Sequence, residues 1–167
     1  MTADDLTGMV LPKIALHSTR GGFVDPSAIE GLTALIIHPY TGKPRIPDPH
    51  GWDQIVGAHG STPQLLAYRA LRAEFEKRGV TLCGISLLSP DWQEEFVHRT
   101  SLTFDLLSDA GWKFTSALQL ETFTADDRSF LRRRTLLAKN GTIVLDRRHV
   151  DPPDSDATAV LKWLVDT

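Results

Sequence analysis

The segment that most constrains the fold is the strand-like run Leu32–His38, which reads LTALIIH. It is apolar almost throughout, whereas a strand with one face in water alternates between apolar and polar residues. Such a strand is typically covered by other elements on both faces. Along the rest of the chain, apolar runs alternate with helix-like stretches, which indicates the α/β class. We therefore expect a central β-sheet flanked by helices.

The other elements are predicted from apolar periodicity and from turn residues. A helix that begins at residue 61 ends at Gly79, and Asn140-Gly141 predicts a hairpin between the last two strands. The remaining strands are predicted at residues 13–18, 80–88, 104–107, 132–138 and 142–146, and the remaining helices at 89–99, 112–118 and 155–166. The expected order is β-β-α-β-α-β-α-β-β-α, in a single domain spanning residues 1–167.

Composition argues against several classes of protein. A net charge of −3 predicts no strong attraction to nucleic acid or to an anionic membrane. No apolar run approaches the length of a spanning helix and the N-terminus lacks an apolar signal region, so we expect a cytoplasmic protein. The histidines form no metal-ligand pair, and neither a metal nor another cofactor is expected. The single cysteine, Cys83, lies within a predicted strand and is interpreted as a small hydrophobic core residue.

A long loop from Pro39 to Gly60 leads directly into the first predicted helix. Loops of this length are usually functional or disordered. This one delivers Ser61 to a helix N-terminus, where backbone N–H groups and the helix dipole favour an anion or a thiolate. Taken alone, Ser61 is more simply interpreted as the N-cap, because serine is among the commonest caps.

A basic run, Arg132-Arg133-Arg134, is the second candidate for a functional site. Neighbouring residues of a strand point to opposite faces, so we expect Arg133 to lie opposite Arg132 and Arg134. One interpretation is a solvated edge, and the other is an arginine that reaches over the sheet to an anion. His59 could act as a base on Ser61, but the sequence around Ser61 is not G-x-S-x-G and no orienting acid is evident. A serine hydrolase is therefore a weak alternative.

Four segments, in order, share the pattern of one known family. Residues 57–64 read GAHGSTPQ, where that family has roughly G-A-x-G-C-T-P-Q. Residues 84–90 resemble its G-I-S-x-x-S-P segment, residues 104–109 its F-x-L-L-S-D segment, and residues 133–136 its R-x-[ST]-[FL] strand. The chain thus resembles peroxiredoxins of the AhpC/TSA type, in the bacterioferritin-comigratory-protein-like branch, from about residue 10 to 165. The resemblance implies a thioredoxin fold with a central mixed β-sheet flanked by helices.

The resemblance also implies a thiol-dependent peroxidase of antioxidant function that reduces hydrogen peroxide or organic hydroperoxides. In that family a cysteine thiolate at the helix N-terminus attacks the peroxide and becomes a sulfenic acid. Ser61 occupies this position here, and Arg133 matches the arginine that stabilises the thiolate. Gly60 and Thr62, on either side of Ser61, match the residues expected to contact the substrate.

The chain departs from the family pattern at other positions. The family hydroxyl residue usually lies three residues before the cysteine, and a proline four residues earlier, where this chain has Ala58 and Gln54. Thr41 and Pro39, at the start of the long loop, are plausible substitutes. The resolving cysteine of many relatives corresponds to Leu66, so no resolving cysteine is expected.

The implied partners are a peroxide substrate and an external thiol reductant, either a thioredoxin- or glutaredoxin-like protein or a small thiol. Relatives include monomers and dimers, so a homodimer is compatible with the resemblance. With serine at position 61 the chain is expected to be inactive. Two explanations stay open: Ser61 replaces a native cysteine by design, or the chain is a naturally thiol-less, non-catalytic redoxin-like binding protein. The retained Gly57–Gln64 motif mildly favours the first.

Overall fold

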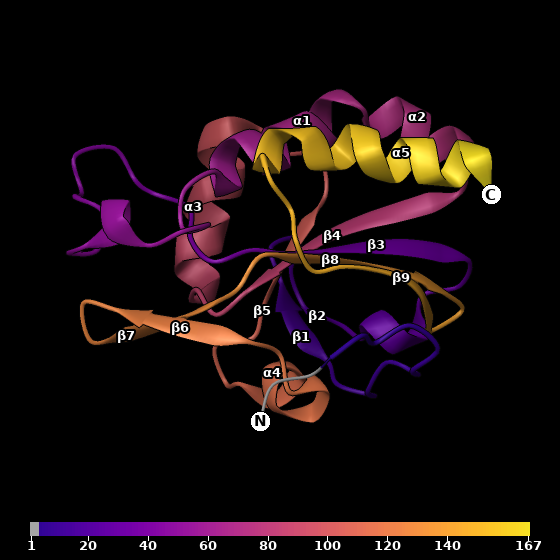
Figure 1. The fold of residues 1–167 in the computed structure, drawn as a ribbon, viewed down its shortest axis with the longest axis horizontal. Helices are drawn as coiled ribbons and strands as arrows, with labels where there is room; N and C mark the ends of the chain where they lie inside the picture. Colours follow the sequence, from indigo (N-terminus) through magenta and orange to yellow (C-terminus); the bar gives the residue numbers. More distant parts are fainter. Residues whose placement is uncertain (1–3) are drawn as a thin grey trace.

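A seven-stranded mixed sheet forms the centre of the computed structural model, which describes residues 4–167 (Figure 1). The strand order is β2-β1-β5-β4-β3-β8-β9, where the strands are β1 (Leu16–Ser18), β2 (Phe23–Val24), β3 (Leu32–Ile37), β4 (Val80–Ser86), β5 (Asp105–Ser108), β8 (Arg134–Lys139) and β9 (Thr142–Arg147). β3 pairs parallel with β4 and antiparallel with β8. The expected mixed sheet is thereby confirmed.

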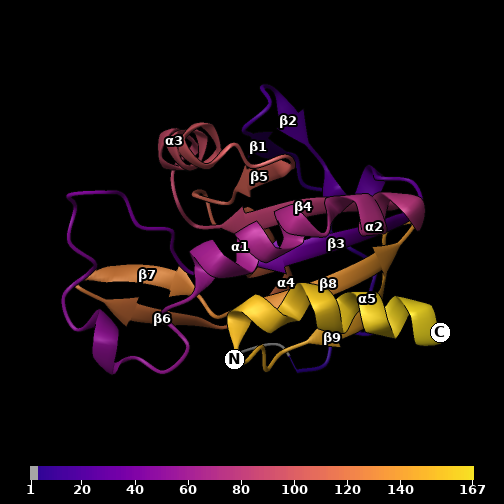
Figure 2. The same ribbon diagram turned by 90° about the horizontal axis from the view of Figure 1, so that it is seen from above.

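Helices cover both faces of this sheet. They are α1 (Ser61–Ala70), α2 (Arg72–Lys77), α3 (Pro90–Thr100), α4 (Lys113–Leu118) and α5 (Asp156–Asp166). In Figure 1, α1, α2 and α5 lie above the sheet and α4 lies below it, while Figure 2 shows α3 on the β5 side. Among residues 4–167, no helix is long and apolar enough to cross a membrane.

The side chains of β3 alternate between two apolar cores, as expected for a strand covered on both faces. Ile36 packs in the cluster that contains Leu65 of α1, whereas Ile37 packs in the cluster that contains Phe114 of α4. Both isoleucines are fully buried. Burial on both faces explains why the run LTALIIH carries almost no polar side chain.

The structure corrects several predicted boundaries. The helix expected at 61–78 is two helices, because Leu71 departs from helical geometry between α1 and α2 (φ −99°, ψ 11°). The strand expected at 132–138 begins only at Arg134. The strand expected at 13–18 is limited to Leu16–Ser18, and the strand expected at 80–88 ends at Ser86. The predicted hairpin at Asn140-Gly141 is confirmed, with positive φ at both residues.

A second hairpin, β6 (Thr122–Ala125) with β7 (Arg128–Leu131), was not expected from the sequence. Its turn residues Asp126 and Asp127 both have positive φ, at 54° and 57°. Two-residue hairpin turns with positive φ favour Gly, Asn and Asp, so the Asp126-Asp127 pair is the sequence signal that could have predicted this hairpin.

The long loop after β3 packs against this second hairpin (Figure 2). Trp52, in the loop, is buried with its ring centroid 4.9 Å from Phe130 and 5.3 Å from Tyr40. Edge-to-face contacts of this kind stabilise aromatic pairs beyond the area that they bury. These aromatic contacts hold the loop in place against the hairpin, and the loop then leads directly into α1.

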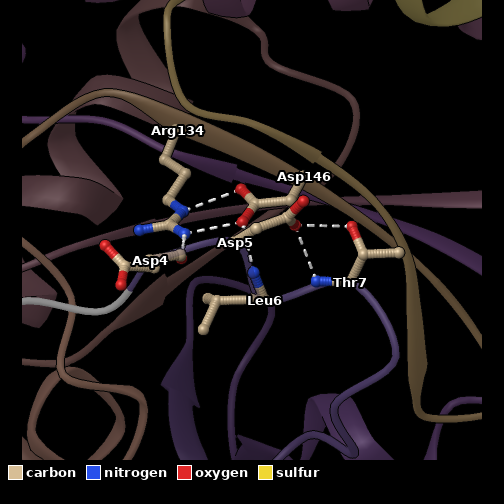
Figure 3. Close-up of polar contacts among 6 residues, drawn as sticks. All are labelled: Asp4, Asp5, Leu6, Thr7, Arg134 and Asp146. Atoms are coloured by element: carbon tan, nitrogen blue, oxygen red, sulfur yellow. Dashed lines mark hydrogen bonds and ion pairs between the residues drawn. The ribbon is translucent and has the colours of Figure 1, made fainter.

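The N-terminal segment is held by an ion pair between β8 and β9 (Figure 3). The guanidinium of Arg134 contacts both carboxylate oxygens of Asp146, at 2.8 and 2.6 Å, and donates to the carbonyl of Asp4 at 2.6 Å. The same carboxylate accepts a hydrogen bond from the backbone N–H of Leu6 at 2.7 Å. Both charged side chains are nearly inaccessible, so this pair anchors the N-terminal segment below the sheet.

Candidate active site

Ser61 is the first residue of α1, and it is buried with 2% of its surface exposed. The N-cap is Gly60, so the interpretation of Ser61 as the capping residue is wrong. Gly60 has a φ of 110°, which favours glycine, and a Cβ there would lie 2.6 Å from Cγ of Pro153. Both constraints reserve the cap position for glycine and place the serine one residue inside the helix.

Arg133 reaches from the residue before β8 to the N-terminus of α1. Its Nη1 donates to Oγ of Ser61 at 3.2 Å and to Oε1 of Gln64 at 2.5 Å. Its Nη2 lies 3.1 to 3.4 Å from three carbonyl oxygens of the loop, those of Gly57, Ala58 and His59. The loop thus closes around the guanidinium, and the two site residues singled out in the sequence are in contact.

The acceptors that surround the Arg133 guanidinium are all neutral. Only 6% of the residue is exposed, and it forms no ion pair with any of residues 4–167. Burial lowers the pKa of Arg133 to about 10, while the charge of Asp156 raises it. The guanidinium therefore stays protonated at neutral pH. Together with the α1 N-terminus, it creates a positive potential at Ser61 that suits an anion or a thiolate.

Pro39 and Thr41 are buried just beyond the end of β3. The backbone carbonyl of Thr41 accepts a hydrogen bond from Nε1 of Trp92 at 2.6 Å, whereas its Oγ1 has no hydrogen-bond partner within residues 4–167. Ala58, at the position where the family pattern has its hydroxyl residue, is buried as well. Thr62, the second residue of α1, is half-buried.

A histidine that the sequence analysis did not single out lies near this arginine. His38 is fully buried, with Nδ1 3.0 Å from the carbonyl oxygen of Ile36 and no partner for Nε2 in the described part of the chain. Burial lowers the pKa of His38 to about 4, and the positive charge of Arg133 acts in the same direction. His38 is therefore neutral at pH 7. A polar residue at the end of an apolar strand is the signal that could have identified it.

Comparison with known proteins assigns the family. The sequence profile of the AhpC/TSA family matches residues 57–150, which is more than half of the chain and includes Ser61 and Arg133. The chain belongs to the AhpC/TSA family. A comparison with curated protein sequences gives no significant match.

Solved structures similar to this AhpC/TSA protein are peroxiredoxins. Peroxidoxin BcpB from Mycobacterium tuberculosis superimposes with a TM-score of 0.78 at 18% identity, covering 99% of this chain and 98% of its own. The bacterioferritin comigratory protein of Xanthomonas campestris gives 0.73 at 23% identity (93% and 95% covered). A cysteine-to-serine mutant of PrxQ from Xylella fastidiosa gives 0.76 at 22% identity (99% and 96% covered). The expected thioredoxin fold and the resemblance to peroxiredoxins are confirmed.

His59 of this AhpC/TSA protein does not face Ser61 in the manner of a catalytic base. Its Nε2 lies 2.6 Å from Oδ1 of Asp53, in a largely exposed pair, and its ring packs edge-on against Trp52. Ser61 Oγ instead accepts a hydrogen bond from Arg133, which is charged at neutral pH and so cannot remove a proton. The arrangement does not support a serine hydrolase.

Cys83 lies on the wrong side of the sheet to serve this site. It packs in the core cluster of α4, whereas α1 packs on the opposite face. Burial raises the pKa of its thiol to about 12, so the thiolate is not formed at neutral pH. These observations agree with the interpretation of Cys83 as a core residue. Within residues 4–167, no group of His, Cys, Asp and Glu is arranged to hold a metal ion.

Proposed function

We propose that this chain carries a peroxiredoxin-type peroxide site in which Ser61 takes the place of the peroxide-reacting cysteine. The observation that carries the proposal is the contact between Ser61 Oγ and Arg133 Nη1 at the buried N-terminus of α1. With serine in place, the site lacks a sulfur that could be oxidised. We therefore propose that the chain has the scaffold of a peroxidase but does not turn over peroxide while position 61 is serine.

A cysteine at position 61 would meet the conditions that lower a thiol pKa. The helix dipole and the Arg133 guanidinium both favour the thiolate. Its sulfur would attack one oxygen of the peroxide and the O–O bond would break. The leaving group, an alkoxide from an organic hydroperoxide or hydroxide from hydrogen peroxide, would take up a proton to give an alcohol or water. The product on the protein is a sulfenic acid, and Arg133 would stabilise the charge on the leaving oxygen.

We assign supporting roles to the neighbours of this position. Gly60 and Thr62 would place their backbone N–H groups against the peroxide, Pro39 would shield the site from water, and the unpartnered hydroxyl of Thr41 would orient the substrate. Because Leu66 stands at the usual resolving position and Cys83 lies across the sheet, the sulfenic acid would need an external thiol as reductant. A cytoplasmic, antioxidant role belongs to the same proposal.

Restoring the sulfur tests this proposal. Ser61→Cys is expected to consume hydrogen peroxide with dithiothreitol as reductant, while the parent chain, with only Cys83, shows the background rate. Thr62→Cys is the matched control, because it places a thiol one residue away on the same helix turn. A rate for Ser61→Cys no higher than that of the parent or of Thr62→Cys would refute the proposal.

A second candidate is a binding protein that keeps the anion site without the chemistry. The observation that favours it is the buried Arg133 in contact with Ser61, without a carboxylate partner within residues 4–167. Acetate and inorganic phosphate are suitable probes for calorimetric titration. The candidate predicts saturable binding to the parent chain and at least about tenfold weaker binding to Arg133→Met, since a charge-assisted hydrogen bond is lost. Equal affinities, or no binding to the parent, would eliminate it.

A further inference from the structure

The buried carboxylate of Asp156, the first residue of α5, accepts four hydrogen bonds, although no sequence pattern connects it to the site. Its Oδ2 accepts from Nε2 of Gln64 at 3.1 Å, from the hydroxyl of Tyr68 at 2.6 Å and from Oγ1 of Thr135 at 2.6 Å. Its Oδ1 accepts from Nε of Arg147 at 2.8 Å. The residue is fully buried, so this carboxylate has a fixed position.

Gln64 connects that carboxylate to the candidate active site. Its Nε2 donates to Asp156, while its Oε1 accepts from Nη1 of Arg133 at 2.5 Å. A carboxylate can only accept hydrogen bonds and a guanidinium can only donate them, so the Gln64 amide has a single orientation that satisfies both. The flipped amide would place oxygen against oxygen and N–H against N–H.

We infer that Asp156 is a positioning residue for the site: through Gln64, it fixes Arg133 Nη1 against the atom at position 61. The same nitrogen that Gln64 holds donates to Ser61 Oγ at 3.2 Å, so the chain of contacts runs from Asp156 to Ser61 without a gap. The inference deepens the proposed function and rests on it for the identity of the reacting atom.

Orientation is the main contribution of Asp156, and net charge is a smaller one. Arg147 already forms an ion pair with Asp156 at 2.8 Å, which offsets the negative charge locally. Arg133 itself and neutral His38 also lie close to the site. The pocket beside Arg133 is lined by further charged or titratable groups: His59, Glu121, Arg132, Arg148, His149 and Asp151. Without a fixed Gln64 amide, Arg133 Nη1 would lose its closest acceptor and could turn away from position 61.

The test in the native chain uses NMR signals of the Arg133 guanidinium. Resolved Nη–H signals are expected in the Ser61 protein, because Gln64 and the loop carbonyls restrain the group. Asp156→Ala and Gln64→Leu should both abolish them, because each removes one partner of the hydrogen bond between Gln64 and Asp156. Tyr68→Phe is the matched control: it removes another hydrogen bond to the same oxygen without breaking the Gln64 link, and should retain the signals. Signals retained in Gln64→Leu, which leaves Asp156 in place, would overturn the inference even where Asp156→Ala fails to fold.

A second readout is the pKa of a thiol at position 61. In Ser61→Cys/Cys83→Ala, the pH dependence of alkylation by iodoacetamide reports that pKa without any peroxide. Adding Gln64→Leu or Asp156→Ala should raise the pKa of this thiol by about one unit, the effect of weakening one charge-assisted hydrogen bond. Tyr68→Phe should leave it near the starting value. If Asp156 only stabilised the fold, the thiol pKa would shift equally in the Gln64, Asp156 and Tyr68 variants. Equal shifts would therefore contradict the inference. If Ser61→Cys ignores peroxide while these differences appear, the proposed function fails and the positioning role stands.

Discussion

Arg133 and Arg134 are neighbours in sequence, are both buried, and point to opposite faces of the sheet, yet their surroundings differ. Arg134 is paired with both oxygens of Asp146 and helps to anchor the N-terminal segment (Figure 3). Arg133 is surrounded by loop carbonyls, a glutamine and Ser61. A cation in contact with a carboxylate is largely neutralised, whereas one held by neutral acceptors keeps its potential available. We propose that Arg134 serves the fold and Arg133 the candidate site.

Breaking the Arg134 ion pair should give the largest effect on stability. Arg134→Met leaves the inaccessible Asp146 carboxylate without its cation, and the loss of one partner of a buried pair costs about 3–5 kcal/mol. The free energy of unfolding from urea titration measures it. Arg134→Met/Asp146→Leu is the control and should recover much of the loss. A cost below about 1 kcal/mol for Arg134→Met would show that the pair does not anchor the fold.

Low pH should reduce the free energy of unfolding through His38, which lies near Arg133. Its folded pKa of about 4 lies below the ordinary 6.5, so between these values the unfolded chain binds a proton that the folded chain excludes. Above pH 6.5 neutral His38 does not reduce the free energy of unfolding. As the pH falls from 6.5 to 4, His38 lowers the free energy of unfolding by up to about 3 kcal/mol. Urea titrations at several pH values should show a shallower pH dependence for His38→Phe than for the parent. Equal pH dependence of the free energy of unfolding in His38→Phe and the parent would contradict the assignment of this effect to His38.

Removing Arg133 should destabilise the fold less than removing Arg134. Arg133→Met leaves neutral acceptors unsatisfied but no carboxylate in direct contact unpaired, at a cost of about 1–3 kcal/mol. The same urea titration gives the comparison directly. A larger loss for Arg133→Met than for Arg134→Met would reverse the division of roles between the two arginines.

The third arginine of the run should have the smallest effect. Arg132 forms a half-exposed ion pair with Glu121 at 3.3 Å, and pairs of this kind contribute at most about 1 kcal/mol. Arg132→Gln is therefore expected to change the free energy of unfolding by less than about 1 kcal/mol. A loss as large as that of Arg133→Met would mean that burial does not separate the three arginines.

Local patterns predicted much of this fold. The apolar run Leu32–His38 predicted a strand covered on both faces, and Asn140-Gly141 predicted its hairpin, because both depend on short stretches of chain. The helix break at Leu71 and the start of β8 at Arg134 depend on packing against distant elements, which periodicity does not report.

The site was predictable only in part. The motifs at residues 57–64 and 133–136 indicated Ser61 and Arg133, and the structure places these two residues in contact. The link from Gln64 to Asp156 joins residues 92 positions apart, and no local pattern encodes such a contact. The capping role of Gly60 depends on Pro153, which comes from the other end of the chain. The unpartnered Nε2 of His38 likewise becomes visible only once its surroundings are known.

Trapping the oxidised sulfur at position 61 tests the proposed peroxide site most directly. Ser61→Cys and Ser61→Cys/Arg133→Met would be treated with hydrogen peroxide and dimedone, and the labelled residue located by peptide mass spectrometry. A sulfenic acid is expected on the cysteine at position 61. It should form at least about tenfold faster with Arg133 present, since a charge-assisted hydrogen bond is lost in the Arg133→Met variant. An unlabelled Ser61→Cys, or equal rates in the two variants, would contradict it.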